Sequence, residues 1–264
     1  MDEIIKYMLR EDEGFGDITS NALIPENKIF YAKLITKDDG ILAGIEIISS
    51  KKDGDAISKG DVLLELEGNA RKILLLERTA LNLLMRMSGV ATITNRIVKK
   101  VHDVNPKIRV AGTRKTAPAL QNYDKLAISI GGGDTHRNAL DDMVLIKDNH
   151  IAVVGSVKKA LELAKENNSF SKKIEIEVES TEDAIIACEN GADIVMFDNM
   201  TPKEAQDTLN ALEEKDLRKD VLIEISGGIT EDNILDYAPL DVDIISLGSL
   251  THQASSLNFS LDMD

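Results

Sequence analysis

The second half of the chain alternates short apolar segments with amphipathic ones. From Ile108 onward, each apolar segment has the length of a buried strand, and the segment that follows has the spacing of a helix. Thr201 and Glu204 form a capping box before the fourth of these helices. This alternation predicts a parallel sheet, either closed as an α/β barrel or open and doubly wound. The predicted strands are residues 108–111, 143–146, 174–178, 194–197, 221–225 and 244–247, and the predicted helices are 119–130, 156–167, 181–190, 202–214 and 231–238.

Polar clusters follow every one of these predicted strands. In an open doubly wound sheet, only the two or three loops at the switch point are expected to carry chemistry. A barrel enzyme uses the loops after all of its strands, so the pattern favours the barrel. The clusters are Thr113-Arg114-Lys115, Lys147-Asp148-Asn149, Glu179, Asp198-Asn199, Ser226-Gly227-Gly228 and Gly248-Ser249.

The first hundred residues have a different pattern. It predicts a short amphipathic helix within residues 1–20, strands at 28–35 and 41–44, and short strands alternating with turns over 51–70. The last of these stretches resembles the hammerhead of biotinyl and lipoyl carrier domains. It lacks the lysine that a carrier presents, so we interpret it as a structural β-module.

A long helix is predicted over residues 73–101. Its apolar positions are too dense for one buried stripe, which indicates contact with another domain or subunit. Glu77, Arg78 and Arg86 interrupt the apolar pattern, and a charge in such a place must be paired or functional. Taken alone, Arg78 is interpreted as a solvated or salt-bridged side chain.

Composition narrows the class of protein. The chain has 264 residues, a formal net charge of −15, 3% aromatic residues and no Trp, which argues against a nucleic-acid interface. Cys188 is the only cysteine, so a disulfide framework and a multi-cysteine zinc site are excluded, and we expect its side chain to be buried. No apolar run approaches the length of a membrane helix, and we expect a cytoplasmic protein.

Cationic residues are concentrated between Thr113 and His150. Arg114 and Lys115 follow one strand, and His136 and Arg137 follow three glycines. A lone histidine is more often a satisfied hydrogen-bond partner than a catalyst, and His102 and His252 are given no role. Two cationic pairs that face each other across a barrel mouth would instead form a clamp for a small dianion.

Acidic and glycine-rich clusters complete the candidate chemistry. Glu175, Glu177 and Glu179 alternate on one face of a strand, where they would either be solvated or bind Mg²⁺, ribose hydroxyls or a developing cation. Asp198 is a second candidate ligand for a metal or a hydroxyl. The loops Ser226–Gly228 and Gly248–Ser249 occupy positions where barrels bind phosphate through backbone N–H groups.

In combination, these motifs resemble the quinolinate phosphoribosyltransferase family, the decarboxylating nicotinate-nucleotide pyrophosphorylases. The resemblance covers essentially the whole chain. It rests on Gly16-Asp17-x-Thr19, Glu77-Arg78-Thr79-Ala80-Leu81-Asn82, Ser88-Gly89-Val90-Ala91-Thr92, Thr113-Arg114-Lys115-Thr116, Gly131-Gly132-Gly133-x-x-His136-Arg137, Leu145-Ile146-Lys147-Asp148-Asn149-His150, Asp198-Asn199, Ser226-Gly227-Gly228 and Thr251-His252.

The resemblance implies an incomplete α/β barrel over residues 104–250 and an N-terminal α/β sandwich over 1–103, on which the tail 251–264 could pack. It implies a homodimer with shared active sites and leaves open whether dimers assemble into a hexamer. Quinolinate would be bound by Arg114, His136, Arg137, Lys147 and the partner's Arg78. Phosphoribosyl pyrophosphate would be bound through Lys115, Glu177, Asp198, Mg²⁺, Ser226, Gly227, Gly228, Gly248 and Ser249, with Lys115, Glu177 and Asp198 as the catalytic residues and Glu177 and Asp198 as candidate metal ligands.

Two features depart from the family pattern. The family usually has Pro-Gly-Leu-Arg where this chain has Pro118-Ala119-Leu120-Gln121, and the usual helix after Gly44 is expected to be much shorter. Two alternatives are retained: a phosphoribosyltransferase of the same fold that acts on nicotinate or another aromatic acid, and a non-catalytic binding protein on this scaffold. A phosphoribosyltransferase for another acid would be expected to lose members of the cationic clamp, all of which are present here. A non-catalytic protein would have no reason to keep the clamp together with Glu177 and Asp198.

Overall fold

The computed structural model describes residues 2–45 and 51–263. The chain forms two compact units, each assembled from separate parts of the sequence. The expected shortening after Gly44 falls on residues 46–50, outside the described part. The first unit contains Met1–Asn95, Ala117–Gly132 and Gln253–Asp264, and the second contains Arg96–Thr116 and Gly133–His252.

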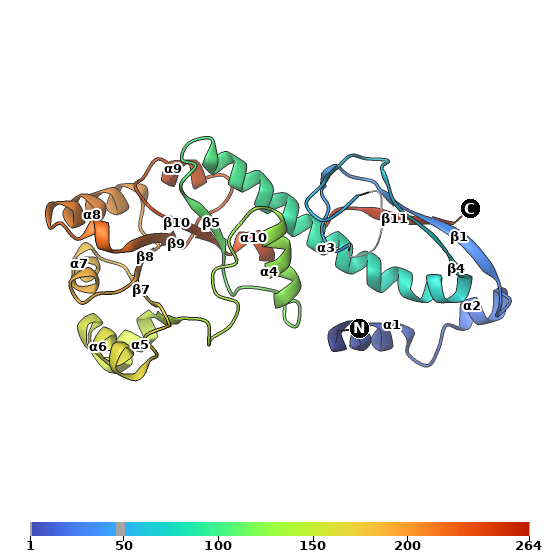
Figure 1. Ribbon diagram of the computed structural model, residues 1–264, viewed down its shortest axis with the longest axis horizontal. Coiled ribbons are helices and arrows are strands. Elements are labelled where there is room, and N and C mark those ends of the chain that lie inside the picture. The colour runs from blue at the N-terminus through green and yellow to red at the C-terminus, as the bar shows by residue number, and fades with distance from the viewer. Residues whose placement is uncertain (1, 46–50, 264) are drawn as a thin grey trace. The chain divides into compact units, whose positions relative to one another are not determined.

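The first unit is built on a small antiparallel sheet. Its strands lie in the order β11 (Phe259–Met263), β1 (Ile29–Thr36), β4 (Val62–Asn69), and a separate pair is formed by β2 (Gly40–Ile41) and β3 (Ala56–Ile57) (Figure 1). Leu34, Leu63 and Phe259 from the sheet pack with Leu81 and Leu84 of the long helix in one hydrophobic core. The predicted strand at 28–35 and the short strands within 51–70 are confirmed, whereas the strand predicted at 41–44 is limited to β2 and does not extend beyond Ile41.

Helices complete the first unit. The predicted N-terminal helix is confirmed as α1 (Glu3–Glu13), which ends at Gly14, and a second helix, α2 (Ile18–Leu23), capped by the Asp17 carboxylate, was not predicted. The long helix is confirmed as α3 (Ala70–His102), whose residues from Arg96 onward belong to the second unit. Helix α4 (Gln121–Ile130) also belongs to the first unit, and its start lies two residues after the predicted one.

The second unit contains a six-stranded sheet in the order β5-β10-β9-β8-β7-β6, and all pairs are parallel. From β6 to β10 each strand pairs with the next one in sequence, and β10 also pairs with β5, whereas β5 and β6 are not paired with each other. The sheet is therefore an incomplete barrel, as the sequence predicts. Its strands are β5 (Arg109–Gly112), β6 (Val144–Ile146), β7 (Ile174–Val178), β8 (Ile194–Asp198), β9 (Leu222–Ser226) and β10 (Ile244–Leu247).

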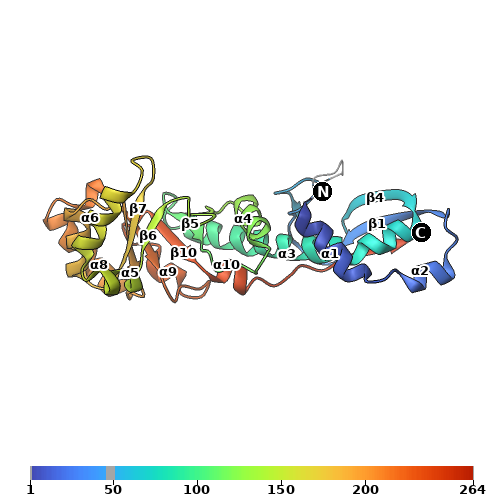
Figure 2. The ribbon, with the colours of Figure 1, turned by 90° about the horizontal axis from the view of Figure 1, so that it is seen from below.

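Helices α6 (Val157–Asn167), α7 (Thr181–Glu189) and α8 (Pro202–Glu214) cover the outer face of this sheet (Figures 1 and 2). The capping box of Thr201 and Glu204 at the start of α8 is confirmed. Three further helices are shorter: α5 (Asp148–Val154), α9 (Ile234–Tyr237) and α10 (Ser249–His252), and a 3-10 turn spans Arg218–Asp220. Helices α5 and α10 were not predicted.

A loop extends the barrel at the free edge of β5. Asp134 forms a parallel bridge with Ala111, because its N–H donates to the Val110 carbonyl at 2.8 Å and its carbonyl accepts from Gly112 N–H at 2.9 Å. His136 and Arg137 follow directly. The segment that contains His136 and Arg137, the predicted clamp residues, therefore follows directly on the edge of β5, which is not paired with β6.

Candidate active site

A cavity of about 520 Å³ lies at the carboxyl ends of the barrel strands, entirely within the second unit. It brings together most of the predicted site residues. Those that line it are Arg114, Lys115, His136, Arg137, Lys147, Glu177, Asp198, Ser226, Gly227 and Gly228. Gly248 and Ser249 do not line it, and Arg78 is an exposed residue of the first unit.

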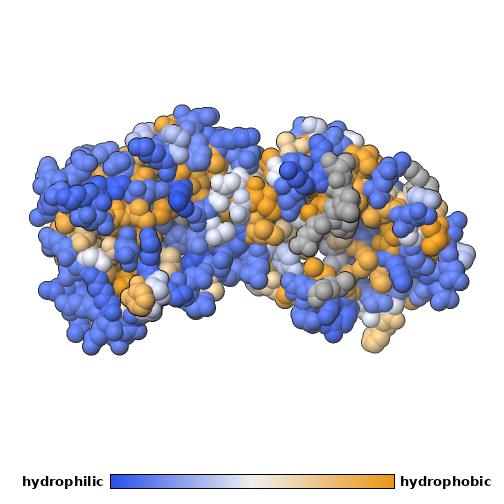
Figure 3. All heavy atoms as spheres, viewed as in Figure 1, coloured by the Kyte–Doolittle hydropathy of each residue, from blue (hydrophilic) through white to orange (hydrophobic). Residues whose placement is uncertain are grey.

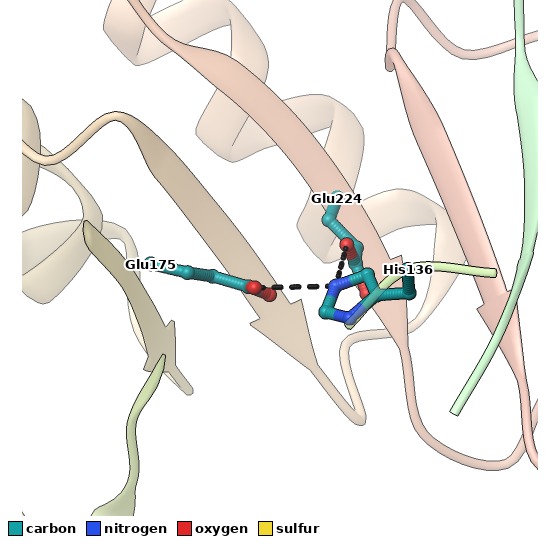
Figure 4. Close-up of side chains that lie close together, drawn as sticks. All are labelled: His136, Glu175 and Glu224. Atoms are coloured by element: carbon teal, nitrogen blue, oxygen red, sulfur yellow. Dashed lines mark hydrogen bonds and ion pairs between the residues drawn. The ribbon is translucent and has the colours of Figure 1, made fainter. Parts of the chain in front are cut away.

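His136 lies between two buried carboxylates. Its Nε2 is 3.1 Å from Glu224 Oε2 on β9 and 3.2 Å from Glu175 Oε2 on β7, and both glutamate side chains are fully buried (Figure 4). Burial by itself would lower the pKa of His136, but the hydrogen bonds to Glu175 and Glu224 and the charges of both carboxylates outweigh it and raise the pKa to about 10. The ring is therefore an imidazolium at neutral pH.

The backbone holds His136 in an uncommon conformation. Its φ of +54° lies in the left-handed region, and its N–H donates to the Asp134 carboxylate at 2.8 Å. A residue with a β-carbon pays of the order of 1–2 kcal/mol for this conformation. The surrounding contacts must supply that free energy, which is a common feature of functional sites.

Arg137 is buried, unlike Arg114 and Lys115. Its side chain donates to the Met143 carbonyl at 3.4 Å. Burial, followed by the neighbouring positive charge of Arg114, lowers its pKa. Arg114 and Lys115 are exposed and free to meet a ligand from solvent.

The segment after β10 supports Lys115. The Thr251 hydroxyl donates to the Lys115 carbonyl at 2.6 Å, and a β-carbon at Gly248 would lie 3.1 Å from Lys115 Cδ. Gly248 therefore allows the lysine stem to pass close to the backbone. This is where the structure places one of the two predicted phosphate loops.

Carboxylates and a lysine lie side by side at the ends of β6, β7 and β8. The Lys147 ammonium forms an ion pair with Glu177, and Asp198 accepts from the Asn199 side-chain amide at 2.9 Å. Glu177 and Asp198 both present carboxylate oxygens to the cavity, which is the donor set that Mg²⁺ prefers. Glu179, the third glutamate of the alternating set, is exposed and does not line the cavity.

The glycine loop after β9 is tightly fitted to the loop after β8. A β-carbon at Gly227, whose φ is +85°, would lie 2.4 Å from Asn199 Oδ1 and 2.6 Å from Asn199 N. At Gly228, with a φ of +63°, no atom lies within 4 Å of the β-carbon position. Gly227 is thus fixed by packing, whereas Gly228 leaves its backbone open to the cavity.

The sequence analysis missed Glu224 and Ser246 as cavity-lining residues, and it did not connect Glu175 with His136. A signal for Glu224 was present. It is an acidic residue inside the otherwise apolar strand 221–225, where a buried charge requires a partner. The partner could not be identified, because it lies 88 residues away in the sequence.

The other singled-out residues lie outside the cavity. Arg86 forms a bidentate ion pair with Asp124, and His102 Nε2 lies 3.0 Å from the Ile108 carbonyl. Cys188 is partly buried, and that burial raises the pKa of its thiol to about 11, so it is an unreactive thiol at neutral pH.

An incomplete α/β barrel whose strand ends carry cations, carboxylates and a glycine loop in one cavity defines an enzyme for small polyanionic substrates. Family models for the N-terminal and C-terminal domains of quinolinate phosphoribosyl transferase match residues 17–88 and 90–262. The chain belongs to the quinolinate phosphoribosyl transferase family.

Named relatives match this chain over nearly all of its length and of their own. The chain is 47% identical to a probable nicotinate-nucleotide pyrophosphorylase (carboxylating) of Methanothermobacter thermautotrophicus, covering 100% of this chain and 99% of that protein. It is 39% identical to the human nicotinate-nucleotide pyrophosphorylase (carboxylating), covering 98% and 90% of the two chains. A crystal structure of NadC from Streptococcus pyogenes superimposes with a TM-score of 0.91 at 36% identity, covering 100% of this chain and 96% of that one.

Among the residues that the structure describes, no helix is both long and apolar enough to cross a membrane.

Proposed function

We propose that the protein transfers the phosphoribosyl group of phosphoribosyl pyrophosphate to quinolinate, with loss of CO₂, and so forms nicotinate mononucleotide and pyrophosphate for NAD biosynthesis. The observation that carries this proposal is one cavity in which five cationic side chains face a glycine loop and four carboxyl groups, those of Asp148, Glu177, Asp198 and Glu224. The two substrates are polyanions, and the names of the relatives describe the same reaction from its product side.

Quinolinate presents two adjacent carboxylates on a pyridine ring. Arg114, His136, Arg137 and Lys147 line the cavity with enough positive charge to bind both of them. The arginines can bind a carboxylate through two parallel hydrogen bonds, whereas Lys147 offers a single charged group. Because Lys147 is paired with Glu177, substrate binding would exchange or share that contact.

The phosphoribosyl donor would lie across the strand ends of β8, β9 and β10. Lys115 and the loop Ser226–Gly228 would bind its phosphates, and Gly248 and Ser249 would support that arrangement from the turn after β10. Glu177 and Asp198 suit Mg²⁺ by their donor chemistry. When bound, Mg²⁺ would neutralise charge on the leaving pyrophosphate.

The chemistry requires orientation and charge. The pyridine nitrogen forms a bond to the anomeric carbon as the bond from that carbon to pyrophosphate breaks, and positive charge develops on the ribose. The carboxylates of Glu177 and Asp198 would stabilise that charge. The 2-carboxylate then leaves as CO₂, its bonding electrons remain on the ring carbon, and that carbon takes up a proton. A covalent nucleophile is unnecessary, which agrees with the position of Cys188 outside the cavity.

A homodimer with shared sites is part of the proposal. The first unit exposes large apolar side chains, which favours a protein partner. Figure 3 shows hydrophobic patches on the surface of both units. Arg78 is exposed on α3 and would reach the cavity of the partner subunit. The exposed large apolar side chains of the first unit include those of Tyr7, Phe15, Ile18, Leu23 and Leu76. We expect the dimer to act in the cytoplasm.

The test is product formation from phosphoribosyl pyrophosphate and Mg²⁺, with quinolinate and nicotinate offered in parallel reactions. Pyrophosphate, CO₂ and nicotinate mononucleotide should all appear with quinolinate. Turnover with nicotinate alone would instead establish a phosphoribosyltransferase with another acceptor. Absence of turnover with both acids would contradict the catalytic proposal and favour a binding protein.

A further inference from the structure

On its buried side His136 meets two buried carboxyl groups, and burial, together with the nearby charge of Glu224, raises the pKa of Glu175 despite its contact with the ring. Glu224 and Glu175 are both fully buried and face the same nitrogen, Nε2. Glu175 Oε1 and Glu224 Oε1 have no hydrogen-bond partner among the described residues, and Glu175 Oε2 has only its ion-pair contact with His136 Nε2 at 3.2 Å. Such an arrangement is costly to bury, so it calls for an explanation beyond packing.

The charged groups around the ring are few. Glu175 faces it from β7 and Glu224 from β9, as Figure 4 shows, and Arg137 and Asp134 belong to its own loop. Strand β8 contributes the uncharged Met196 and, at its end, Asp198 to the cavity, and β10 contributes the uncharged Ser246. In the described part of the chain, neither Asp198 nor any other charged group besides the two glutamates forms a hydrogen bond or ion pair with the ring. The two glutamates are therefore the groups that decide the state of the imidazole.

The position of the two oxygens determines which ring nitrogen is free. Nε2 faces two carboxylate oxygens and must carry a hydrogen, since a bare nitrogen would repel both. No partner of Nδ1 is found in the part of the chain that the structure describes, and the residue lines the cavity. Nδ1 is therefore the nitrogen that remains for a ligand.

Charge decides what Nδ1 can do. In a neutral ring that carries its hydrogen on Nε2, Nδ1 is a bare acceptor and repels a carboxylate. In an imidazolium, Nδ1 carries a second hydrogen and donates to a carboxylate in a charge-assisted bond. His136 therefore binds a carboxylate through Nδ1–H when the ring is charged, and repels it when the ring is neutral.

We propose that Glu224, together with Glu175, is a positioning residue that holds His136 as a fixed imidazolium, so that Nδ1–H is always available to a carboxylate of the acceptor substrate. This inference rests on the proposed function, because it names quinolinate as the ligand. Glu224 touches no substrate in this scheme and acts only through the ring. The raised pKa of His136 agrees with the geometry.

The primary experiment measures the quinolinate KM and kcat of the wild type and of Glu224→Gln from pH 6 to pH 9. In the wild type, His136 stays charged over this range, so its ionisation should leave KM unchanged. Removing one carboxylate lowers the pKa of His136, and the variant should lose acceptor affinity as pH rises, by about tenfold or more at pH 9 relative to pH 6.5. kcat should change much less, and Glu175→Gln should behave in the same way.

Matched controls separate this effect from general damage. Glu189→Gln makes the same change on the exposed surface of α7 and should reproduce the wild-type profile. NMR titration of the imidazoles in the absence of substrate gives a second, independent reading. His136, identified by the loss of its signal in His136→Gln, should show no inflection up to pH 9 in the wild type and an inflection well below that in Glu175→Gln/Glu224→Gln.

The outcomes distinguish this inference from the proposed function. Quinolinate turnover by the wild type, with KM profiles of the wild type and Glu224→Gln that coincide, would overturn the positioning role and leave the function standing. Failure of the wild type to use quinolinate would overturn the function. The His136, Glu175 and Glu224 ligand atoms all lie within 4.8 Å of one another, so elemental analysis of the purified protein is included. One equivalent of a transition metal, lost in His136→Gln, would replace the proposal with a metal site.

Discussion

Four residues other than glycine have positive φ values among those described: Ala119, His136, Asn199 and Asp216. His136 and Asn199 both line the cavity. The left-handed backbone places their side chains where an extended or helical backbone would not, and the cost is met by local hydrogen bonds. Ala119 lies outside the cavity and occupies the position where the family pattern usually has glycine.

Ala119→Gly should stabilise the protein. Ala119 has a φ of +65°, which glycine adopts without the steric cost that a β-carbon imposes. Part of the gain is offset by the greater freedom of glycine in the unfolded chain, so we expect the free energy of unfolding to rise by about 0.5–1 kcal/mol. Urea denaturation measures it. Ala117→Gly, at a position without positive φ, should lower the stability instead; equal effects at both positions would contradict this account.

Gly227→Ala should be more destabilising than Gly228→Ala. Both positions have positive φ, and adding a β-carbon there lowers the free energy of unfolding by about 1–2 kcal/mol. At residue 227 the new methyl group would also overlap the backbone nitrogen of Asn199, which cannot move without displacing the loop. Thermal unfolding of the two variants provides the comparison, and equal melting temperatures would show that the contact with Asn199 relaxes freely.

At the scale of elements, one ion pair joins α3 to α4 within the first unit. Arg86 donates from Nε and Nη2 to the two oxygens of Asp124 at 2.8 and 2.7 Å, and the Asp124 side chain is fully buried. Asp124 also accepts from Ala117 N–H at 3.2 Å. The arginine that interrupts the apolar pattern of α3 therefore has a structural partner.

Arg86→Met should destabilise the protein by about 3–5 kcal/mol, because it leaves the Asp124 carboxylate buried without its cation. The double variant Arg86→Met/Asp124→Leu should recover much of that loss, since both charges are then absent. Arg96→Met is the control: Arg96 pairs with Glu231 on the surface and should cost no more than about 1 kcal/mol. Urea unfolding measures the free energy of unfolding of each variant. If Arg86→Met lowers it no more than Arg96→Met does, the account of the buried ion pair is wrong.

At the scale of the whole molecule, the net charge is negative, whereas the candidate active site contains a cluster of cationic side chains. The chain has a net charge of −15, yet its cavity is lined by Arg114, Lys115, His136, Arg137 and Lys147. A local cationic cavity in an acidic protein selects small anions that can enter it. Long polyanions such as nucleic acids would meet the acidic exterior first.

The proposed dimer makes a prediction about mixed subunits. Arg78→Ala and Lys115→Ala should each be nearly inactive, since one lacks the residue donated to the partner and the other lacks a residue of its own cavity. After subunit exchange in an equal mixture, half of the dimers contain both variants, and one of the two sites in each is intact. About a quarter of wild-type activity should return.

Steady-state rates of the mixture, with the oligomeric state followed by light scattering, test this outcome. A mixture of Lys115→Ala with Arg114→Ala is the control. Both substitutions remove residues of the same cavity, so no site in the mixed dimer is complete. Recovery in the control, or none with Arg78→Ala despite proven exchange, would refute the sharing of sites.

Local patterns in the sequence predicted the barrel well. The strands and helices of the second unit follow from apolar periodicity, and the capping box at Thr201 and Glu204 from residue type and spacing. Strand β11 and helix α10 were missed because each depends on tertiary contacts: β11 pairs with β1, and Thr251 of α10 hydrogen-bonds to Lys115.

By itself, the sequence determined the family, the barrel and the side chains available for binding anions, because these depend on residue type, spacing and local periodicity. Only the tertiary structure decided which buried charges meet. Glu175, Glu224 and His136 lie on different elements far apart in the chain, and the closure of β5 to β10 brings them within hydrogen-bonding distance. The charge of an imidazole depends on its neighbours in space, which no local pattern records.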